Sequence, residues 1–220
     1  ISRVDRLMLG IMSTPDSVGI YSAAALIAFQ ASFFLFVFAS IFRPFIVDLF
    51  HSGRKKRLEG MYKSVTRWTF GLTLPAVIMF ILFSTEIMHI FGADFTKGYS
   101  SLITLSLAQI AVVIVGPAIH ILIMTGLNRL ELYNNLILGF VNIVLNLILI
   151  PEMGILGAAI ATAISYFLIN SLRLIEIYYH YGMNPYRMSF FKVIGAGIFI
   201  YILGYISNVI LPSDNLLWVV

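Results

Sequence analysis

Six apolar stretches, each long enough to cross a lipid bilayer, constrain this sequence more than any other feature. A membrane-spanning helix needs about 20 consecutive, mostly apolar residues. The stretches that reach this length are residues 19–47, 68–91, 102–126, 132–151, 155–178 and 190–211. They lack the alternating polarity and the length of about 10 residues that are typical of barrel strands. Because only helices or closed barrels satisfy the backbone in lipid, the sequence predicts an all-α, polytopic transmembrane helical bundle.

The composition agrees with a lipid environment. Of the 220 residues, 60% are apolar and 11% are charged, whereas a soluble domain carries about 25% charged residues. The absence of Cys excludes disulfides, thiolate catalysis and Cys-ligated metals. The net charge of +4 is typical of a membrane protein with basic cytoplasmic connections. We therefore expect no nucleic-acid partner, and no motif calls for a cofactor.

Both ends of the sequence lie in apolar surroundings. The chain opens on Ile1, without an initiator Met, and partial spans lie at residues 1–12 and from residue 216 onward. We therefore expect residues 1–220 to form a single membrane domain cut from a longer polypeptide. This domain would hold about six full transmembrane helices and partial helices at both ends, and an N-terminal lobe would be missing.

The positive charges predict one orientation in the membrane. If the connection at residues 51–63 is cytoplasmic, alternation places residues 128–131 and 180–189 on the same side. The cations of that side are Arg54, Lys55, Lys56, Arg57, Lys63, Arg67, Arg129, Arg173, Arg187 and Lys192. The opposite side keeps only Lys97. This agreement with the positive-inside rule predicts a multi-pass protein of the cytoplasmic membrane.

Three consecutive spans carry polar residues at helical spacing, on one face of each helix. The stripes are Ser106, Gln109, Gly116 and His120; Asn135, Gly139, Asn142 and Asn146; and Thr162, Tyr166, Asn170 and Arg173. They either bond neighbouring helices together or line a wetted cavity. Small residues at four-residue steps within residues 154–165 indicate close helix packing instead.

A few charged residues are candidates for a role inside the membrane. Arg3, Asp5 and Arg6 precede an apolar run, so they either face a cavity or mark a helix end at the interface. Arg43 either reaches a phosphate group or extends to the cytoplasmic headgroups. His120 is either a proton relay or a packed, hydrogen-bonded histidine.

Motifs of catalysis are absent from the sequence. It contains no Asp-x-Asp pair, no Gly-rich phosphate loop and no His/Glu metal spacing. The predicted connections are about a dozen residues or shorter, which leaves no room for a soluble catalytic domain. We therefore expect a protein that is not an enzyme.

Two segments resemble a known family of transporters. Residues 3–10 (RVDRLMLG) and 18–24 (VGIYSAA) resemble the start of the second half of polysaccharide flippases, and residues 149–162 (LIPEMGILGAAIAT) resemble a recurrent segment of these proteins. Arg43-Pro44, Phe91-Gly92 and residues 125–129 fall at matching places. The chain is thus similar to the Wzx-type O-antigen and repeat-unit flippases of the multidrug/oligosaccharidyl-lipid/polysaccharide exporter superfamily.

The resemblance implies the C-terminal lobe of a two-lobed, MATE-like transporter that works by alternating access. Its cargo would be a polyprenyl-pyrophosphate-linked oligosaccharide for cell-surface polysaccharide biosynthesis. The partners would be this lipid-linked sugar, membrane lipids, and the polysaccharide polymerase and glycosyltransferases of the pathway. Arg3, Arg6 and Arg43 would meet the pyrophosphate or acidic sugars, and Asp5 would pair with them or couple an ion. The remaining cavity candidates are Gln109, His120, Asn142 and Asn146.

Two other functions stay open on the sequence alone. A cation-coupled multidrug antiporter of the same superfamily would place carboxylates in its cavity, whereas the deep spans here are nearly free of Asp and Glu. A membrane-embedded glycosyltransferase or ligase would need a larger loop with catalytic residues than any found here.

Overall fold

The computed structural model describes residues 2–210, with side chains described for residues 3–206. Within this range every regular element is a helix. The elements are α1 (Ser2–Met12), α2 (Pro15–Gln30), α3 (Phe33–His51), α4 (Lys55–Leu82), α5 (Ser84–His89), the 3-10 helix η1 (Ala93–Gly98), α6 (Tyr99–Val113), α7 (Ala118–Met124), α8 (Asn128–Met153), α9 (Ile155–Tyr181) and α10 (Met188–Ile210). The predicted partial span from residue 216 lies outside the described residues.

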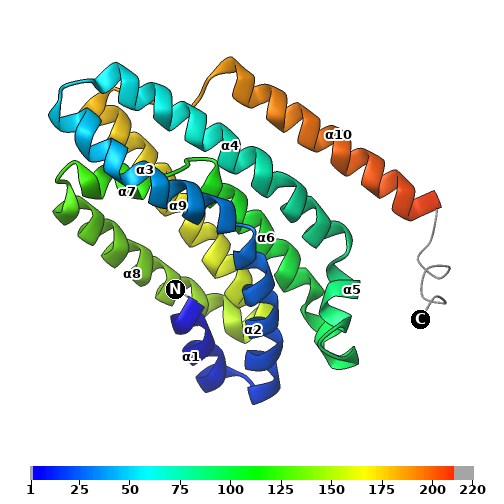
Figure 1. The fold of residues 1–220 in the computed structure, drawn as a ribbon. Helices are drawn as coiled ribbons and strands as arrows, with labels where there is room; N and C mark the ends of the chain where they lie inside the picture. The colour runs from blue at the N-terminus through cyan, green and yellow to red at the C-terminus, as the bar shows by residue number, and fades with distance from the viewer. Residues whose placement is uncertain (1, 211–220) are drawn as a thin grey trace.

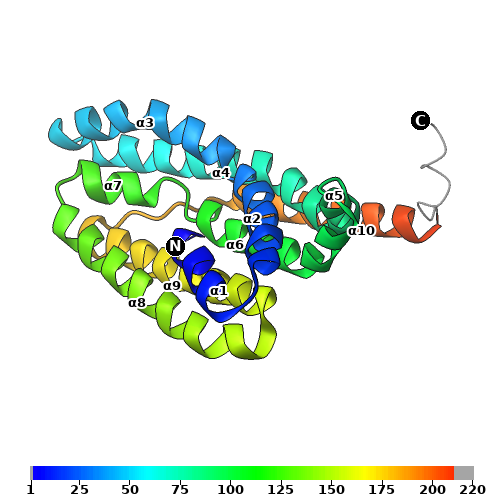
Figure 2. The ribbon, with the colours of Figure 1, turned by 90° about the horizontal axis from the view of Figure 1, so that it is seen from below.

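The prediction of a polytopic helical bundle is confirmed. Five of the described helices are long and apolar enough to cross a membrane, and a sixth span results if the bent pair formed by residues 93–113 and α7 counts as one. Helix α9 packs between α8 and α6, α3 packs along α4, and α10 packs against the other side of α4 (Figures 1 and 2). The short helix α1 contacts α2, α8 and α9.

Three of the predicted spans are not single helices; the stretch at residues 68–91 divides at Phe83 into the end of α4 and the short α5. The stretch at residues 19–47 is interrupted at Ala31 and Ser32, between α2 and α3. The stretch at residues 102–126 is interrupted between α6 and α7, where the axis bends by 44°. Pro117 cannot donate a helical hydrogen bond, and Gly116 has a φ of +61°, which disfavours any residue with a Cβ. The sequence predicted unbroken helices because that prediction used only the length of each apolar stretch.

Side chains of helix α4 form hydrogen bonds with backbone carbonyls at the α2–α3 and α6–α7 breaks. The Tyr62 hydroxyl donates to the Val115 carbonyl over 2.8 Å, at the α6–α7 break. The Thr73 hydroxyl donates to the Ala31 carbonyl over 3.0 Å, at the α2–α3 break. Irregular backbone at membrane depth is tolerated only where protein or a wet cavity surrounds it. These two contacts from one helix therefore stabilise both breaks.

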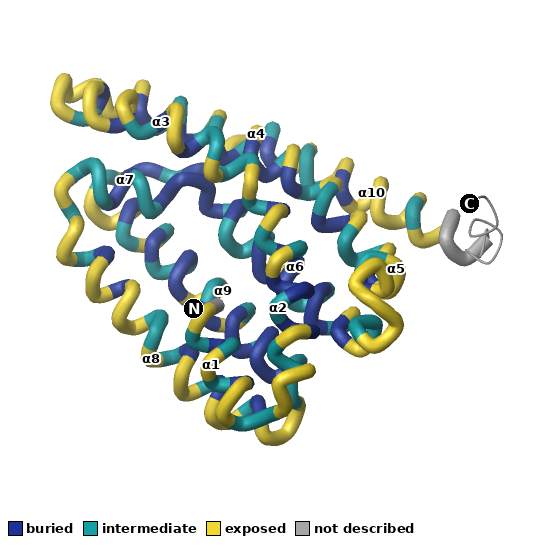
Figure 3. Tube along the Cα trace, turned by 60° about the horizontal axis from the view of Figure 1, so that its bottom comes forward, coloured by how far each residue is buried: buried dark blue, intermediate teal, exposed yellow. Residues whose placement is uncertain are grey.

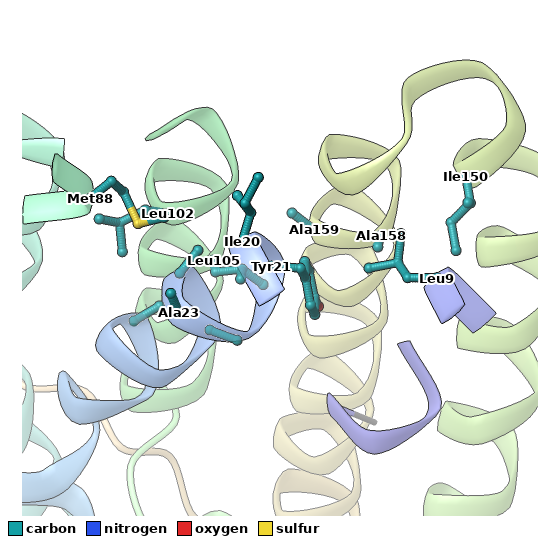
Figure 4. Packing of buried hydrophobic residues seen from close by; sticks show 13 residues of the cluster. Leu9, Ile20, Tyr21, Ala23, Met88, Leu102, Leu105, Ile150, Ala158 and Ala159 are labelled. Carbon is teal, nitrogen blue, oxygen red and sulfur yellow. The ribbon is translucent and has the colours of Figure 1, made fainter. Parts of the chain in front are cut away.

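The outer surface of the bundle is apolar. Figure 3 shows exposed residues along the outer sides of α3, α8 and α10, and buried residues concentrated toward α2, α6 and α9. On α8 the exposed side chains include Leu136, Phe140 and Leu147. The core where α1, α2, α8 and α9 meet is packed by Leu9, Tyr21 and small residues of α9 (Figure 4). An exposed apolar surface around a packed interior is the arrangement that lipid favours.

The connections divide between the two ends of the bundle. The α3–α4 and α7–α8 connections lie at one end, while the α1–α2 connection and the α5–η1 segment lie at the other (Figure 1). The first end carries Arg54, Lys55, Lys56 and Arg57, and the second carries Lys97 paired with Asp94. This division of charge agrees with a cytoplasmic α3–α4 end.

Replacing Tyr62 by Phe tests the support that α4 gives to the α6–α7 break. The substitution keeps the ring but leaves the buried Val115 carbonyl without its donor, which costs about 1–3 kcal/mol. We expect a clearly lower midpoint of thermal unfolding for the purified protein in detergent. Tyr99→Phe, at a residue that is 47% exposed, is the matched control and should leave the midpoint unchanged. Equal midpoints for both variants would contradict this role.

Candidate functional site

The carboxylate of Asp5 is the centre of a buried polar cluster. Asp5 is fully buried, although it belongs to the short first helix. Its Oδ2 accepts hydrogen bonds from the Tyr21 hydroxyl at 2.9 Å and the Thr162 hydroxyl at 2.7 Å. Its Oδ1 accepts a third from Nδ2 of Asn146 at 2.8 Å. Four helices, α1, α2, α8 and α9, thus meet at one acidic side chain.

Local sequence explains how these side chains reach one point. Asp5 and the buried Leu9 are four residues apart, so they share the inner face of α1. Asn142 and Asn146 share a face of α8 in the same way, and both are fully buried. A Cβ on Gly157 would overlap the Leu149 carbonyl, so this glycine lets α8 and α9 approach closely.

The small residues around Thr162 therefore have two roles. Their spacing predicted helix packing, and the structure confirms that Gly157, Ala158 and Ala161 are buried between helices. Figure 4 shows Ala158 and Ala159 facing Leu9 and Tyr21 at this contact. Thr162 belongs to the same face, but its hydroxyl also donates to the carboxylate of Asp5.

The electrostatics of Asp5 are unusual for a buried acid. Among residues 3–206, no basic side chain forms an ion pair with it; all three of its partners are neutral. Asn146 Nδ2 also donates to Oδ1 of Asn142 over 3.2 Å, and Oδ1 of Asn146 is buried without a partner. A buried carboxylate surrounded by neutral oxygens and amides lacks a compensating positive charge. Such a site suits a proton or a small monovalent cation.

A second polar cluster joins α8 to α9 nearer the α7–α8 connection. Arg173 and Glu131 form an ion pair through two hydrogen bonds; the bond from Nε to Oε2 measures 3.1 Å, and the other joins Nη2 to Oε1. Both side chains are at most 10% exposed. Beside them, Nδ2 of Asn134 donates to Oε2 of Glu176 over 2.7 Å. Unlike Asp5, Glu131 therefore has a full counter-charge.

The polar stripe of α9 connects the two clusters. Thr162 bonds Asp5 at one end of the stripe, and Arg173 bonds Glu131 at the other. Tyr166 and Asn170 lie between them on the same face. Eleven residues of helix separate the ends, which corresponds to about 16 Å along the axis. The polar stripe predicted for residues 162–173 thus lies in the interior and spans a large part of the bundle.

The arginines predicted to bind pyrophosphate lie in different surroundings. Nη2 of Arg43 lies 3.5 Å from Nε2 of His120, which joins α3 to α7. Arg6 is partly buried, whereas Arg3 is exposed. The Nε atoms of Arg6 and Arg43 are buried without a hydrogen-bond partner among the described residues. The structure therefore brings Arg43 to His120, but it does not pair Asp5 with Arg3 or Arg6.

The stripe predicted for residues 106–120 needs a correction. Ser106 and Gln109 lie on α6 and His120 lies on α7, so the bend at Gly116 divides the expected single face. Gln109 is buried and accepts a hydrogen bond from the Ser32 hydroxyl over 2.6 Å, beside the α2–α3 break. On α8, Asn135 is exposed and bonds Glu131 of its own helix, whereas Asn142 and Asn146 point inward.

Sequence reasoning missed four members of these clusters, Tyr21, Glu131, Asn134 and Glu176. Tyr21 lies in the VGIYSAA segment, but its hydroxyl gave no separate signal. Glu131 was placed in a connection, although it follows the start of a long helix and is 42 residues from its partner Arg173. The available signal was that Glu131 near the start of α8 and Arg173 near the end of α9 carry opposite charges at the same end of the bundle. Within the described residues, no group of three His, Cys, Asp or Glu side chains could hold a metal ion.

The fold and these buried clusters define a polytopic helical membrane protein with a charged interior. No protein-family model matches the chain, and no solved structure matches it. Among curated proteins it is 31% identical, over 169 residues, to the probable low-salt glycan biosynthesis flippase Agl15 of Haloferax volcanii. That match covers 75% of this chain and 35% of the relative.

Two further relatives are more distant. The probable flippase AglR of the same organism is 27% identical over 74% of the chain and 35% of its own length. The uncharacterized membrane protein MJ1068 of Methanocaldococcus jannaschii is 27% identical over 82% of the chain and 37% of its own length. The chain spans about a third of the length of the curated relatives it matches. The relatives named flippases support a flippase-like family and a membrane transporter rather than an enzyme.

The Glu131–Arg173 pair gives a test of the charged interior. Glu131→Gln leaves the guanidinium of Arg173 buried without its counter-charge, which costs about 3–5 kcal/mol. We expect a large fall in the midpoint of thermal unfolding. Glu59→Gln, which removes the partner of Lys63 in a more exposed pair, should cost about 1 kcal/mol or less. If the midpoint of thermal unfolding falls no further in Glu131→Gln than in this control, the Glu131–Arg173 pair does not stabilise the bundle.

Proposed function

We propose that this chain is part of a flippase that moves a lipid-linked oligosaccharide across the cytoplasmic membrane by alternating access. The observation that carries the proposal is the similarity, over three quarters of the chain, to a protein named as a flippase of glycan biosynthesis. A lipid-linked sugar also makes glycosyltransferases and a polymerase of the same pathway the expected functional partners.

The charges of the interior support an anionic cargo. Arg6 and Arg43 each keep a buried Nε atom free of protein partners among the described residues. A guanidinium group presents several donors in a planar fork that suits phosphate oxygens. A pyrophosphate that reaches these side chains would satisfy donors that the protein leaves open. The polyprenyl chain would stay in the bilayer, against the apolar outer surface.

Asp5 supplies a means of coupling transport to an ion. Its carboxylate joins α1 to α2, α8 and α9 through neutral donors alone. Uptake of a proton or a monovalent cation there would neutralise the only carboxylate of the cluster and change the strength of all three hydrogen bonds. The site would thereby bias how α1 packs on the other helices, which is the kind of shift that alternating access requires.

A reconstituted transport assay tests the proposed cargo. The full-length protein is placed in liposomes that contain a polyprenyl-pyrophosphate oligosaccharide, and an added lectin reports how much sugar reaches the outer leaflet. An Arg3→Ala/Arg6→Ala/Arg43→Ala variant should lose at least about tenfold in rate, because each charge-assisted bond to the phosphate is worth roughly 1.5–3 kcal/mol.

Arg54→Ala/Lys56→Ala/Arg57→Ala removes the same number of charges from exposed residues and serves as the control. If both triple variants transfer sugar at the same rate, Arg3, Arg6 and Arg43 do not bind the cargo. Absence of transfer by the well-folded intact protein would argue against the flippase function itself.

A cation-coupled antiporter is the second candidate, because Asp5 is a buried carboxylate of the kind that binds Na⁺ or H⁺. The same liposomes, loaded with a fluorescent cationic dye under a Na⁺ or pH gradient, distinguish the two functions. For a coupled flippase, Asp5→Asn should abolish the effect of the gradient on sugar transfer, and no dye should move. Asp94→Asn, at an exposed residue, is the control. Gradient-driven dye accumulation without sugar transfer would favour the antiporter.

A further inference from the structure

A small basic notch lies between α4 and the start of α10, apart from the interior clusters. It is lined by Gly60, Lys63, Ser64 and Arg67 of α4 and by Arg187 and Ser189 from the α10 side, and it encloses about 70 Å³. Nη1 of Arg67 donates to the Ser189 hydroxyl over 3.2 Å, which ties the two sides together. Three cations and two hydroxyls thus surround one small space.

The positive charge of this notch is not neutralised by the protein. Lys63 pairs with Glu59 over 2.6 Å, but no carboxylate pairs with Arg67 or Arg187 among residues 3–206. Arg67 also lies over the ring of Trp68, with its Cζ atom 5.6 Å from the ring centroid. Two guanidinium groups are therefore available to an anion, and phosphate oxygens are the partner that they suit best.

The surroundings of the notch are typical of a membrane interface. Trp68 is 56% exposed and points away from the core, as is typical of tryptophans in the interfacial belt of a membrane. The notch belongs to the same end of the bundle as the basic α3–α4 connection, which the charge distribution places on the cytoplasmic side.

An apolar groove begins about one helical turn beyond the notch. It runs between α4, α6 and α10, encloses about 540 Å³, and is lined by side chains such as Phe70, Leu74, Leu107 and Ile198. Gly197 allows α10 to approach α4 closely, since a Cβ at this position would overlap the Leu74 side chain. This volume falls within the range of small-ligand pockets, about 300–1,000 Å³.

We propose that the notch and the groove together bind one anionic phospholipid, with its phosphate against Arg67 and Arg187 and one hydrocarbon chain between α4 and α10. A basic notch and an apolar groove that both lie between α4 and α10, about one helical turn apart, match the two ends of such a molecule. A free phosphate ion would use only the notch, and a neutral lipid would use only the groove. Basic pockets between helices on the cytoplasmic side are known physical sites for anionic headgroups. The bound lipid would hold α10 against α4.

Native mass spectrometry of the delipidated full-length protein, titrated with phosphatidylglycerol and with phosphatidylcholine of the same chains, tests the headgroup. Phosphatidylglycerol should bind at least tenfold more tightly. Arg67→Gln/Arg187→Gln should weaken its binding by about 25-fold, since each cation near an anionic headgroup contributes roughly fivefold. Lys56→Gln/Arg57→Gln, at exposed residues of the same helix, should change it less than threefold. Arg187→Gln alone should weaken it about fivefold and serves if the double variant does not fold.

A second variant tests the groove. Ile198→Phe enlarges a side chain that lines the groove and should weaken phosphatidylglycerol binding, whereas Ile202→Phe, at an exposed residue of the same helix outside the groove, should not. Equal binding of the two lipids, or equal losses in the notch and control variants, would overturn the proposal. If millimolar inorganic phosphate displaces the lipid and Ile198→Phe has no effect, the site binds phosphate alone, and the proposal is overturned as well.

Discussion

Every backbone carbonyl and amide that leaves a helix within lipid must find a partner inside the protein, and this requirement determines how the bundle is built. At the α2–α3 and α6–α7 breaks, the carbonyls of Ala31 and Val115 accept side-chain hydrogen bonds in place of helical ones. The side chains that satisfy both carbonyls, Thr73 and Tyr62, come from the single long helix α4. Helices α3, α6 and α10 all pack on α4 as well. Helix α4 therefore has two roles: it packs against these three helices, and it provides the hydrogen bonds that irregular backbone needs within a membrane.

The same low dielectric gives the two buried acids different properties. Glu131 has Arg173 as a counter-charge and forms a closed, bidentate pair, whereas Asp5 has only hydroxyl and amide donors. In a medium that solvates charge poorly, a compensated pair is a structural contact, while an uncompensated carboxylate responds to its ionic surroundings. The contrast explains why Asp5 is the stronger candidate for coupling, although both residues are equally hidden from solvent.

Several features could be predicted because they depend on local pattern. The helical class follows from the length of the apolar stretches, and the inward direction of Asn142, Asn146 and Thr162 follows from their helical spacing. The α2–α3 and α6–α7 breaks were not predicted. Gly116 and Pro117 were a local signal for the second break that apolar length alone does not use, whereas the stabilising partners of the two breaks lie 42 and 53 residues away. The contacts of Asp5 could not be predicted for a related reason. Thr162 belongs to a predicted polar stripe, but it is 157 residues distant from Asp5 and no local pattern pairs the two.

By itself the sequence determined that this chain crosses a membrane as helices, and its cations predicted which end of the bundle is cytoplasmic. These properties depend on hydropathy, helical period and the distribution of cations, all of which are read along the chain. Only the tertiary structure decided that Asp5 lacks a counter-charge, that Glu131 has one, and that α4 supports both breaks. It also decided that Arg67 and Arg187 share a notch above an apolar groove. These relations join helices far apart in sequence, and which side chains meet is fixed by how the helices pack against one another.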